Sequence, residues 1–148
     1  MAKSDLYKSF IALMNGDATI SGIIGTEAVH AQVAMLDRTG EQGKPAIVYD
    51  ASSDTPEYGF DGRGAAGERL NSVSLDVYAV HDTFTDSLAL IEAVEDAMEG
   101  WSGTTSTIDV SKAFKVEGSD AFVEIEEGLE FPRRAHTQAW VVWYRTIA

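Results

Sequence analysis

Residues 45–101 read PAIVYDASSDTPEYGFDGRGAAGERLNSVSLDVYAVHDTFTDSLALIEAVEDAMEGW. The stretch contains, in order, a short apolar segment, a glycine-rich segment, an alternating segment and an amphipathic segment that ends at Gly100-Trp101. Pro45 precedes the apolar segment, and a strand tolerates proline at its first position. We therefore predict a strand over 46–51, followed by a long loop over 52–67 that contains four glycines and Pro56.

Two regular elements are predicted after this loop. Residues 68–80 alternate, with Val73, Leu75, Val77 and Ala79 on one side, which is typical of a half-buried strand. Thr83 or Thr85 is positioned to cap a helix that Gly100 ends. The helix carries one apolar stripe opposite four acids, the stripe being Phe84, Leu88, Ile91, Val94, Met98 and Trp101 and the acids Glu92, Glu95, Asp96 and Glu99.

The segments before and after this stretch add a helix and several strands. Apolar spacing predicts a first helix over 5–14 capped by Ser4, a short helical turn over 20–24, and a strand over 29–35. The last third reads as three strands, over 108–116, 121–131 and 137–147.

The last of these strands is apolar on both sides. Trp140, Val142 and Tyr144 alternate with Val141 and Trp143, and Ile147 continues the second set. A strand of this kind is either central between two layers or covered by a partner chain.

Composition limits the class of protein. The 148 residues fit one domain, expected to span 1–148, and include no cysteine, which suits a reducing cytoplasm. The longest apolar run is Ala139 to Tyr144, far below the roughly 20 residues of a membrane span, and the first residues read as a retained helix.

The net charge is −13, and no Lys or Arg occurs between Leu70 and Ser111. Such a surface repels phosphate backbones, which argues against tight nucleic-acid binding. Solubility is one explanation of the charge, and an acidic bore through which DNA passes is another.

Sequence motifs for nucleotide binding, metal binding or catalysis are weak. Residues 62–67 match G-x-G-x-x-G, but a strand rather than a helix follows, so we expect a flexible loop and no nucleotide site. The helical acids could bind a divalent cation but fit a solvated face better. His30, His81 and His136 stand apart in sequence, and no G-x-S-x-G occurs. We expect no catalytic residue, no metal and no cofactor.

Several short motifs occur in a characteristic order: PAIVY at 45–49, Phe60-Asp61-Gly62, DVYA at 76–79, EGW at 99–101 and VWYR at 142–145. In this order the chain resembles the tail terminator (tail completion, tail-to-head joining) proteins of long-tailed bacteriophages. The residues by themselves indicate a small acidic α+β domain. The resemblance implies an α+β, ring-forming subunit whose mainly antiparallel sheet is packed by two principal helices.

The same resemblance implies a structural role without a cofactor. A ring, expected to be a homohexamer, would cap the tail tube at its head-proximal end in the virion, after assembly in the host cytoplasm. Its partners would be other copies of itself, the tail tube protein and the head-tail connector or neck protein. DNA would be only a passing cargo, and no membrane would be involved.

Basic residues are scarce, so the arginines near predicted loops are candidates for contacts between subunits. Arginine suits bidentate pairing with the carboxylates of another copy, although solubility or pairing within the chain also explains it. Arg133-Arg134 follows Pro132 and is predicted to lie in a turn. We expect subunit or partner contacts at Tyr58, Phe60, Asp61, Arg63, Arg69, Arg133, Arg134 and Trp140.

Two other readings stay open. A head-completion or neck-connector component would also form a ring but would leave the length of the tail unchanged. A small cytoplasmic enzyme or ligand-binding domain would need a concave site with perturbed acids.

Overall fold

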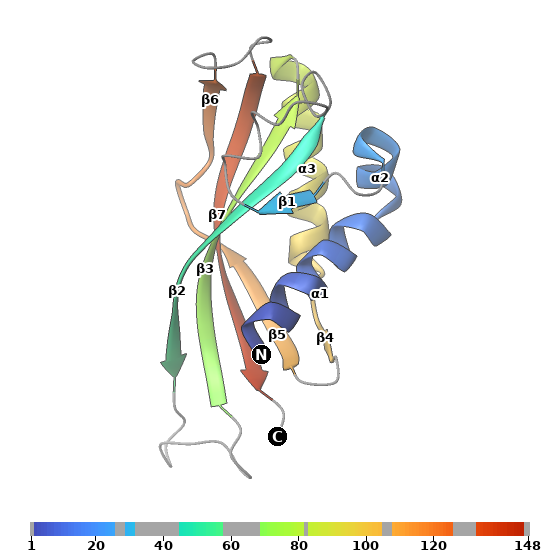
Figure 1. The fold of residues 1–148 in the computed structure, drawn as a ribbon. Coiled ribbons are helices and arrows are strands. Elements are labelled where there is room, and N and C mark those ends of the chain that lie inside the picture. The colour runs from blue at the N-terminus through green and yellow to red at the C-terminus, as the bar shows by residue number, and fades with distance from the viewer. Residues whose placement is uncertain are drawn as a thin grey trace.

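The computed structural model describes residues 2–25, 29–31, 45–57, 69–81, 83–104, 108–125 and 133–146. These residues form an α+β fold, a mainly antiparallel sheet with helices packed on it, as the sequence predicts (Figure 1). The helices are α1 (Ala2–Gly16), α2 (Ala18–Ile24) and α3 (Phe84–Glu99). The strands are β1 (Val29–Ala31), β2 (Ala46–Glu57), β3 (Arg69–His81), β4 (Gly103–Thr104), β5 (Ile108–Lys115), β6 (Ala121–Ile125) and β7 (Arg133–Thr146).

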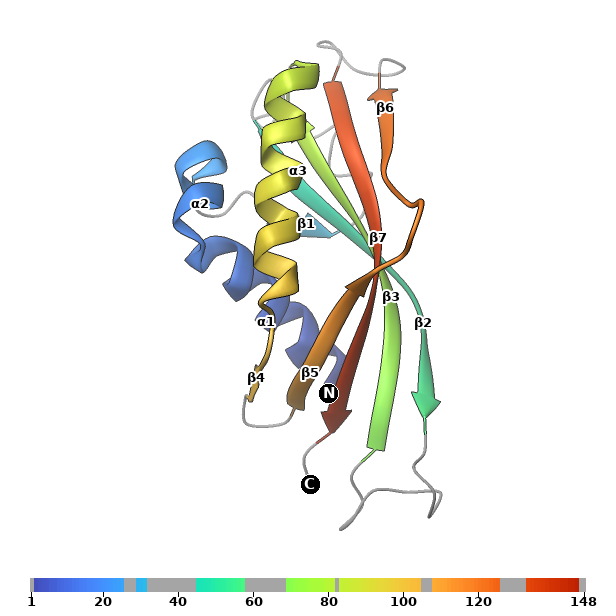
Figure 2. The same ribbon diagram turned by 180° about the vertical axis from the view of Figure 1, so that it is seen from behind.

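Strand β7 is the central strand of the sheet, whose order is β1-β2-β3-β7-β5-β4. Strand β3 pairs with one edge of β7 from Arg69↔Thr146 to His81↔Arg134. The other edge is shared, because β5 pairs with the C-terminal half of β7 and β6 with its N-terminal half (Figure 2). The pairing of β1 with β2 is parallel, and the other pairings are antiparallel.

The turn between β5 and β6 satisfies the backbone of β7 where neither strand does. The N–H of Val116 donates to the carbonyl oxygen of Ala139 at 2.8 Å. The hydroxyl oxygen of Ser119 accepts from the N–H of Ala139 at 3.1 Å. Gly118 supplies the left-handed φ of 76° that the turn requires, a conformation in which glycine is not strained.

The main core lies between one face of the sheet and the three helices. On β3 the predicted inward set is confirmed, since Val73, Leu75, Val77 and Ala79 are buried. The ring of Phe10, on α1, contacts Tyr49 of β2 at 5.1 Å and Trp101 at 5.9 Å between centroids. These aromatic contacts hold α1 against both the sheet and the end of α3.

Several local predictions are confirmed. Thr83 caps α3, its hydroxyl oxygen accepting from the N–H of Asp86 at 3.1 Å, and Gly100 follows the helix. The helical turn at 20–24 corresponds to α2 without its first two residues, and Asp17 caps this helix. The strands predicted over 68–80 and 108–116 match β3 and β5 to within one residue at each end.

Other boundaries differ from the prediction. Helix α1 begins at Ala2, so Ser4 lies inside it and does not cap it. Strand β2 continues to Glu57, so residues 52–57 are strand and not loop. Its register with β3 shifts between Ala51 and Asp54. A bulge of this kind leaves an extra residue unpaired, and the pairing continues beyond it. The rest of the predicted loop, 58–67, lies outside the described residues.

Strand β7 also begins earlier than predicted, at Arg133. Arg133 and Arg134 are therefore in the strand and not in a turn, because β6 pairs with both residues. The first and sixth strands are described only over Val29–Ala31 and Ala121–Ile125, and the other residues predicted for them lie outside the described ranges.

The helical stripe needs one correction. Phe84 is the first residue of α3 and is 50% exposed, so it is not a core residue. Leu90, which the stripe omitted, is fully buried. The reason is geometric: Phe84 packs on His136 and Phe122 at the first turn of the helix, where half of the side chain stays exposed, whereas Leu90 lies in the middle turns over the core.

Candidate functional site: the open face of the sheet

The described helices all pack on one face of the sheet, and we call the opposite face the open face (Figure 1). Alternation assigns side chains to it. Trp140, Val142 and Tyr144 of β7 are buried towards the helices, so Val141 and Trp143 point to the open face, where both are partly exposed. This explains the two-sided apolar pattern of the last strand: one side is core, and on the other side Val141 and Trp143 stay partly exposed. Nearer the start of the strand, Ala135 of this second side is buried in a small cluster with Val48 and Val80.

A surface of mixed apolar and basic character covers part of the open face. It comprises Lys112, Phe114, Val141, Trp143 and Arg145, and we call it the Phe114 patch. Phe114 is paired with Val141 across the ladder, and Lys112 with Trp143. Phe114 is 52% exposed, and the Lys112 ammonium lies 5.8 Å from the centre of its ring. Large apolar side chains exposed beside one another mark a surface that another molecule can cover.

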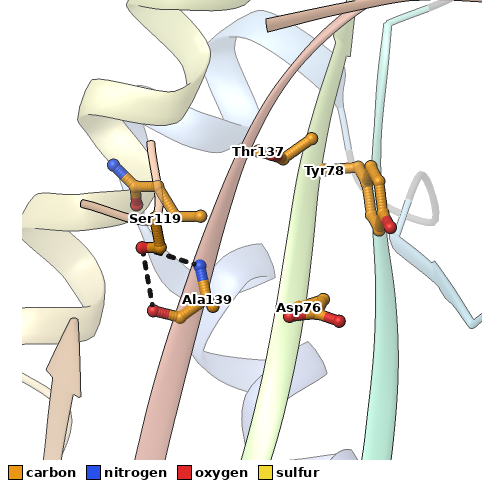
Figure 3. Close-up of a pocket in the computed structure, with 6 residues that line it drawn as sticks. Asp76, Tyr78, Ser119, Thr137 and Ala139 are labelled. Atoms are coloured by element: carbon orange, nitrogen blue, oxygen red, sulfur yellow. Dashed lines mark hydrogen bonds between the residues drawn. The ribbon is translucent and has the colours of Figure 1, made fainter. Parts of the chain in front are cut away.

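A hollow of about 210 Å³ adjoins the Phe114 patch on the same face. Figure 3 shows Asp76 and Tyr78 on one side of the hollow and Ser119 on the other, with Thr137 and Ala139 of β7 between them. The small side chains of β7 at this level leave the space. Its lining is mostly polar, so it suits a polar or charged group better than a lipid-like ligand.

Two carboxylates face each other at the edge of this hollow. Asp50 of β2 is directly opposite Asp76 of β3, and both are exposed. Like charges in directly opposed positions of a ladder destabilise it. The pKa of the nearby Tyr78 hydroxyl is raised, first by burial and then by the charges of Asp76 and Asp50. This part of the open face therefore favours positive charge.

A polar network supports the sheet behind the hollow. Gln138, which is 4% exposed, donates to Glu95 at 3.0 Å and to Asp120 at 2.8 Å. Its carbonyl oxygen accepts from the indole N–H of Trp140 at 3.1 Å. The ammonium of Lys115 pairs with Glu95 and Asp120 at 2.5 and 3.0 Å. The hydrogen bond from Gln138 and then that from Lys115 lower the pKa of Asp120.

Glu95 is therefore part of this structural network. This matters for the divalent-cation site that the acids of α3 could form. Glu92, Asp96 and Glu99 are exposed, whereas Glu95 turns to Lys115 and Gln138. Within the described ranges, no group of three or more His, Asp or Glu side chains is arranged to hold a metal ion.

Sequence reasoning missed one pair of residues that carries chemistry. The hydroxyl of Ser87, on α3, lies 2.6 Å from Nδ1 of His136, on β7. The rings of Phe84 and Phe122 pack against the imidazole at 4.6 and 4.9 Å. Ser87 is fully buried and His136 is 9% exposed, so the pair joins α3 to the sheet where a substrate has no access. No sequence signal links two residues 49 positions apart.

The predicted interface residues are scattered. Tyr58, Phe60, Asp61 and Arg63 lie outside the described residues. Arg69 begins β3 and Arg133 begins β7, and because the two strands are antiparallel these arginines are at opposite ends of the sheet. Arg134 is next to Arg133 and is partly buried. Trp140 is 1% exposed in the core, so its ring is not at the surface of the single chain.

None of the described helices is long and apolar enough to cross a membrane.

Comparison with known proteins adds a likeness of fold. No protein-family profile matches the sequence, and no curated protein matches it. Among solved structures, one similar chain comes from the "virion of native gene transfer agent (GTA) particle". The TM-score is 0.67 and the identity 13%, over 95% of this chain and 94% of that one. The two chains therefore share one fold over nearly their whole lengths.

Proposed function

We propose that this chain is a structural virion protein, a tail terminator whose ring caps the tail tube, ends its polymerisation and joins the tail to the head connector. The observation that carries the proposal is the fold, which the chain shares over 95% of its length with a chain of a gene transfer agent virion. The motif order of residues 45–101 supports the finer assignment, because it resembles tail terminators in particular.

The open face supports an assembling protein. The Phe114 patch leaves aromatic and aliphatic surface uncovered by the described residues, and assembly would bury it. The function would be geometric: one side of the ring matches the last ring of the tube, and the other matches the connector. A head-to-tail arrangement of identical subunits closes into a ring when the rotation between neighbours allows it. We expect a homohexamer at the head-proximal end of the tail.

A head-completion or neck-connector component is the second candidate. The same observations support it, since a connector also forms a ring and also exposes surfaces for its neighbours. The two functions differ in what happens to the length of the tail when the protein is missing.

The test is deletion of the gene from the phage or prophage that encodes it, with negative-stain electron microscopy of the lysate. A plasmid copy of the wild-type gene serves as the control and must restore infectious particles. Overlong, headless tails beside filled, tailless heads are expected. Tails of normal length that do not join heads would reject termination in favour of the neck role. Intact, infectious particles would reject both virion roles.

A further inference from the structure

We propose that the ring is closed by a head-to-tail contact in which the Phe114 patch of one copy packs against the outer side of α3 of the next copy. This inference rests on the proposed ring. It names the two surfaces that would form the contact, and both consist of described residues.

The first surface combines apolar area with positive charge. Phe114 is 52% exposed and Val141 and Trp143 are partly exposed beside it. Lys112 and Arg145 border this area, and Asp109 pairs with Arg145 at 3.1 Å. The side chain of Lys112 is exposed, and its ammonium lies 5.8 Å from the centre of the Phe114 ring.

The second surface is an acidic stripe along α3. Thr85, Ala89, Glu92, Asp96 and Glu99 are all exposed and follow one another at helical spacing, on the side of α3 that faces away from the sheet. The helix contains no Lys or Arg. Asp96 and Glu99 lie in its last turn, where negative charge opposes the helix dipole, and a cation from another molecule would relieve this. We call these five residues the α3 stripe.

The charge of the chain argues for a second copy as the occupant. Copies with a net charge of −13 repel each other, so they associate favourably only where the few basic residues meet acids. A contact between the Phe114 patch and the α3 stripe sets Lys112 of one copy against Glu92 and Asp96 of the next. Potentials of opposite sign across a contact favour the correct partner and orientation.

The two surfaces are different, as a ring contact requires. The Phe114 patch is on the open face and the α3 stripe is on the outer side of α3, and they come closest at Glu99, which lines one hollow with Lys112 and Phe114. A contact between two different surfaces of a subunit is heterologous and can repeat around a ring. The alternative places Lys112 against Asp50 and Asp76 of a copy that faces it. Such a contact is self-complementary and closes after two subunits, so it would not build a ring.

The absence of cysteine from the chain permits a direct test. Full-length proteins with a single cysteine beside the proposed charges, which are all kept, are purified separately: Ser111→Cys, Ala89→Cys, Ser74→Cys and Thr19→Cys. Ser111→Cys is mixed with each of the others at high protein concentration, treated with a short bismaleimide, and analysed by mass spectrometry and gel electrophoresis. Ser111 is exposed next to Lys112, Ala89 is exposed in the α3 stripe, and Ser74 is exposed on the open face near Asp76. Thr19 is exposed on α2, outside both surfaces, and provides the matched control.

A crosslinked heterodimer is expected from Ser111→Cys with Ala89→Cys, and background only with Thr19→Cys. High salt should reduce the yield, because the contact includes exposed charges. Crosslinking to Ser74→Cys in place of Ala89→Cys would overturn the proposal in favour of face-to-face pairing. No crosslink above the Thr19 background in any mixture would overturn it as well.

Charge reversal provides a second measurement. Lys112→Glu and Asp96→Lys should each weaken crosslinking between an otherwise matched pair of cysteines at Ser111 and Ala89, by about tenfold. Mixing the two reversed proteins should restore it, because the charges are complementary again. Failure of the mixture to restore the yield would contradict the assigned pairing.

The outcome is separable from the proposed function. A crosslink between position 111 and position 89, together with intact tails after deletion of the gene, would support the contact and reject the terminator. Overlong tails after deletion without this crosslink would do the opposite.

Discussion

The hydroxyl of Ser87 and Nδ1 of His136 lie 2.6 Å apart, joining the first turn of α3 to the central strand of the sheet. Phe84 and Phe122 enclose the imidazole from α3 and β6. Burial lowers the pKa of His136, against weaker opposing effects of Asp120 and Glu92. The folded state therefore favours the neutral imidazole, and protonation of His136 destabilises the fold.

Stability should decrease on acidification below about pH 6.5. The unfolded chain binds a proton at His136 near its ordinary pKa of 6.5, whereas the folded chain resists it until a lower pH. The contribution of this group is complete above pH 6.5 and is lost as the pH falls towards the folded pKa. Urea unfolding followed between about pH 7 and about pH 5 should show a free energy of unfolding that rises with pH, by at most about 1.4 kcal/mol per pH unit for this one proton.

The test variant is His136→Gln, which removes the imidazole. It should flatten the dependence on pH in this window whatever its stability at neutral pH. An unchanged slope in His136→Gln would assign the effect to another group.

Gln138→Leu should destabilise the fold by about 1–3 kcal/mol. The leucine fills similar space but leaves the indole N–H of the buried Trp140 without its acceptor. Lys115→Met is the comparison within the same network. It removes ion pairs whose partners are partly exposed and should cost no more than about 1 kcal/mol. Chemical denaturation of the two variants gives the comparison, and equal losses would contradict the assigned role of Gln138.

The same variant should raise the pKa of Asp120. The hydrogen bond from Gln138 is the main cause that lowers it, so the carboxyl should move back towards its ordinary pKa of 3.8 when that donor is removed. NMR titration of the Asp120 carboxyl carbon measures this directly. If the pKa of Asp120 stays unchanged in Gln138→Leu but rises in Lys115→Met, the hydrogen bond from Lys115, and not that from Gln138, is the main cause of the lowered pKa.

Phe10→Ala should cost about 3–5 kcal/mol, since it removes a fully buried ring from between Tyr49 and Trp101. Lys8→Ala, on the exposed side of α1, is the control and should change stability by at most about 0.5 kcal/mol. Thermal unfolding compares the two. A small effect of Phe10→Ala would mean that α1 contributes little to the folded core.

Asp76→Asn should stabilise the chain by about 0.2–1 kcal/mol, because it removes the repulsion between directly opposed carboxylates on β2 and β3. The pKa of Tyr78 should fall towards its ordinary value and stay above it, since burial is the larger cause. Spectrophotometric titration of the tyrosines detects the second effect. Glu117→Gln, an exposed change of the same charge in a turn, controls for net charge, and an equal gain there would refute the pairwise cause.

The elements predicted best are those with strong local patterns. The alternation of residues 68–80 and the apolar stripe after Thr83 correspond to β3 and α3, and the cap is Thr83, one of the two threonines that the sequence offered. The extension of β2 over 52–57 was missed because its residues are polar and include Pro56, and only pairing with β3 keeps them in the sheet. In the same way, β6 and β3 hold Arg133 and Arg134 in a strand that a preceding proline suggested was a turn.

Candidate sites were less accessible to sequence reasoning than the fold. The Phe114 patch combines residues of β5 and β7. Phe114 is a single aromatic residue in a predicted strand, and the sequence pattern does not indicate that its side chain is exposed. Ser87 and His136 are likewise ordinary in sequence and close only in space. The Phe114 patch depends on strand register, which is set by contacts along the whole ladder. The Ser87–His136 pair depends on how α3 packs on the sheet, which no local motif determines.

The sequence by itself determined the acidic charge, the absence of thiol chemistry, and the type of most helices and strands, because charge, composition and periodicity are local properties of the chain. Only the tertiary structure decided that β7 is central, that β5 and β6 share its second edge, and that the helices cover one face of the sheet. This arrangement results from pairing between segments that are distant in sequence. Its stability is the sum of backbone hydrogen bonds and buried surface area over many residues. The open face, the surface on which the proposed ring contact depends, exists only after that pairing is made.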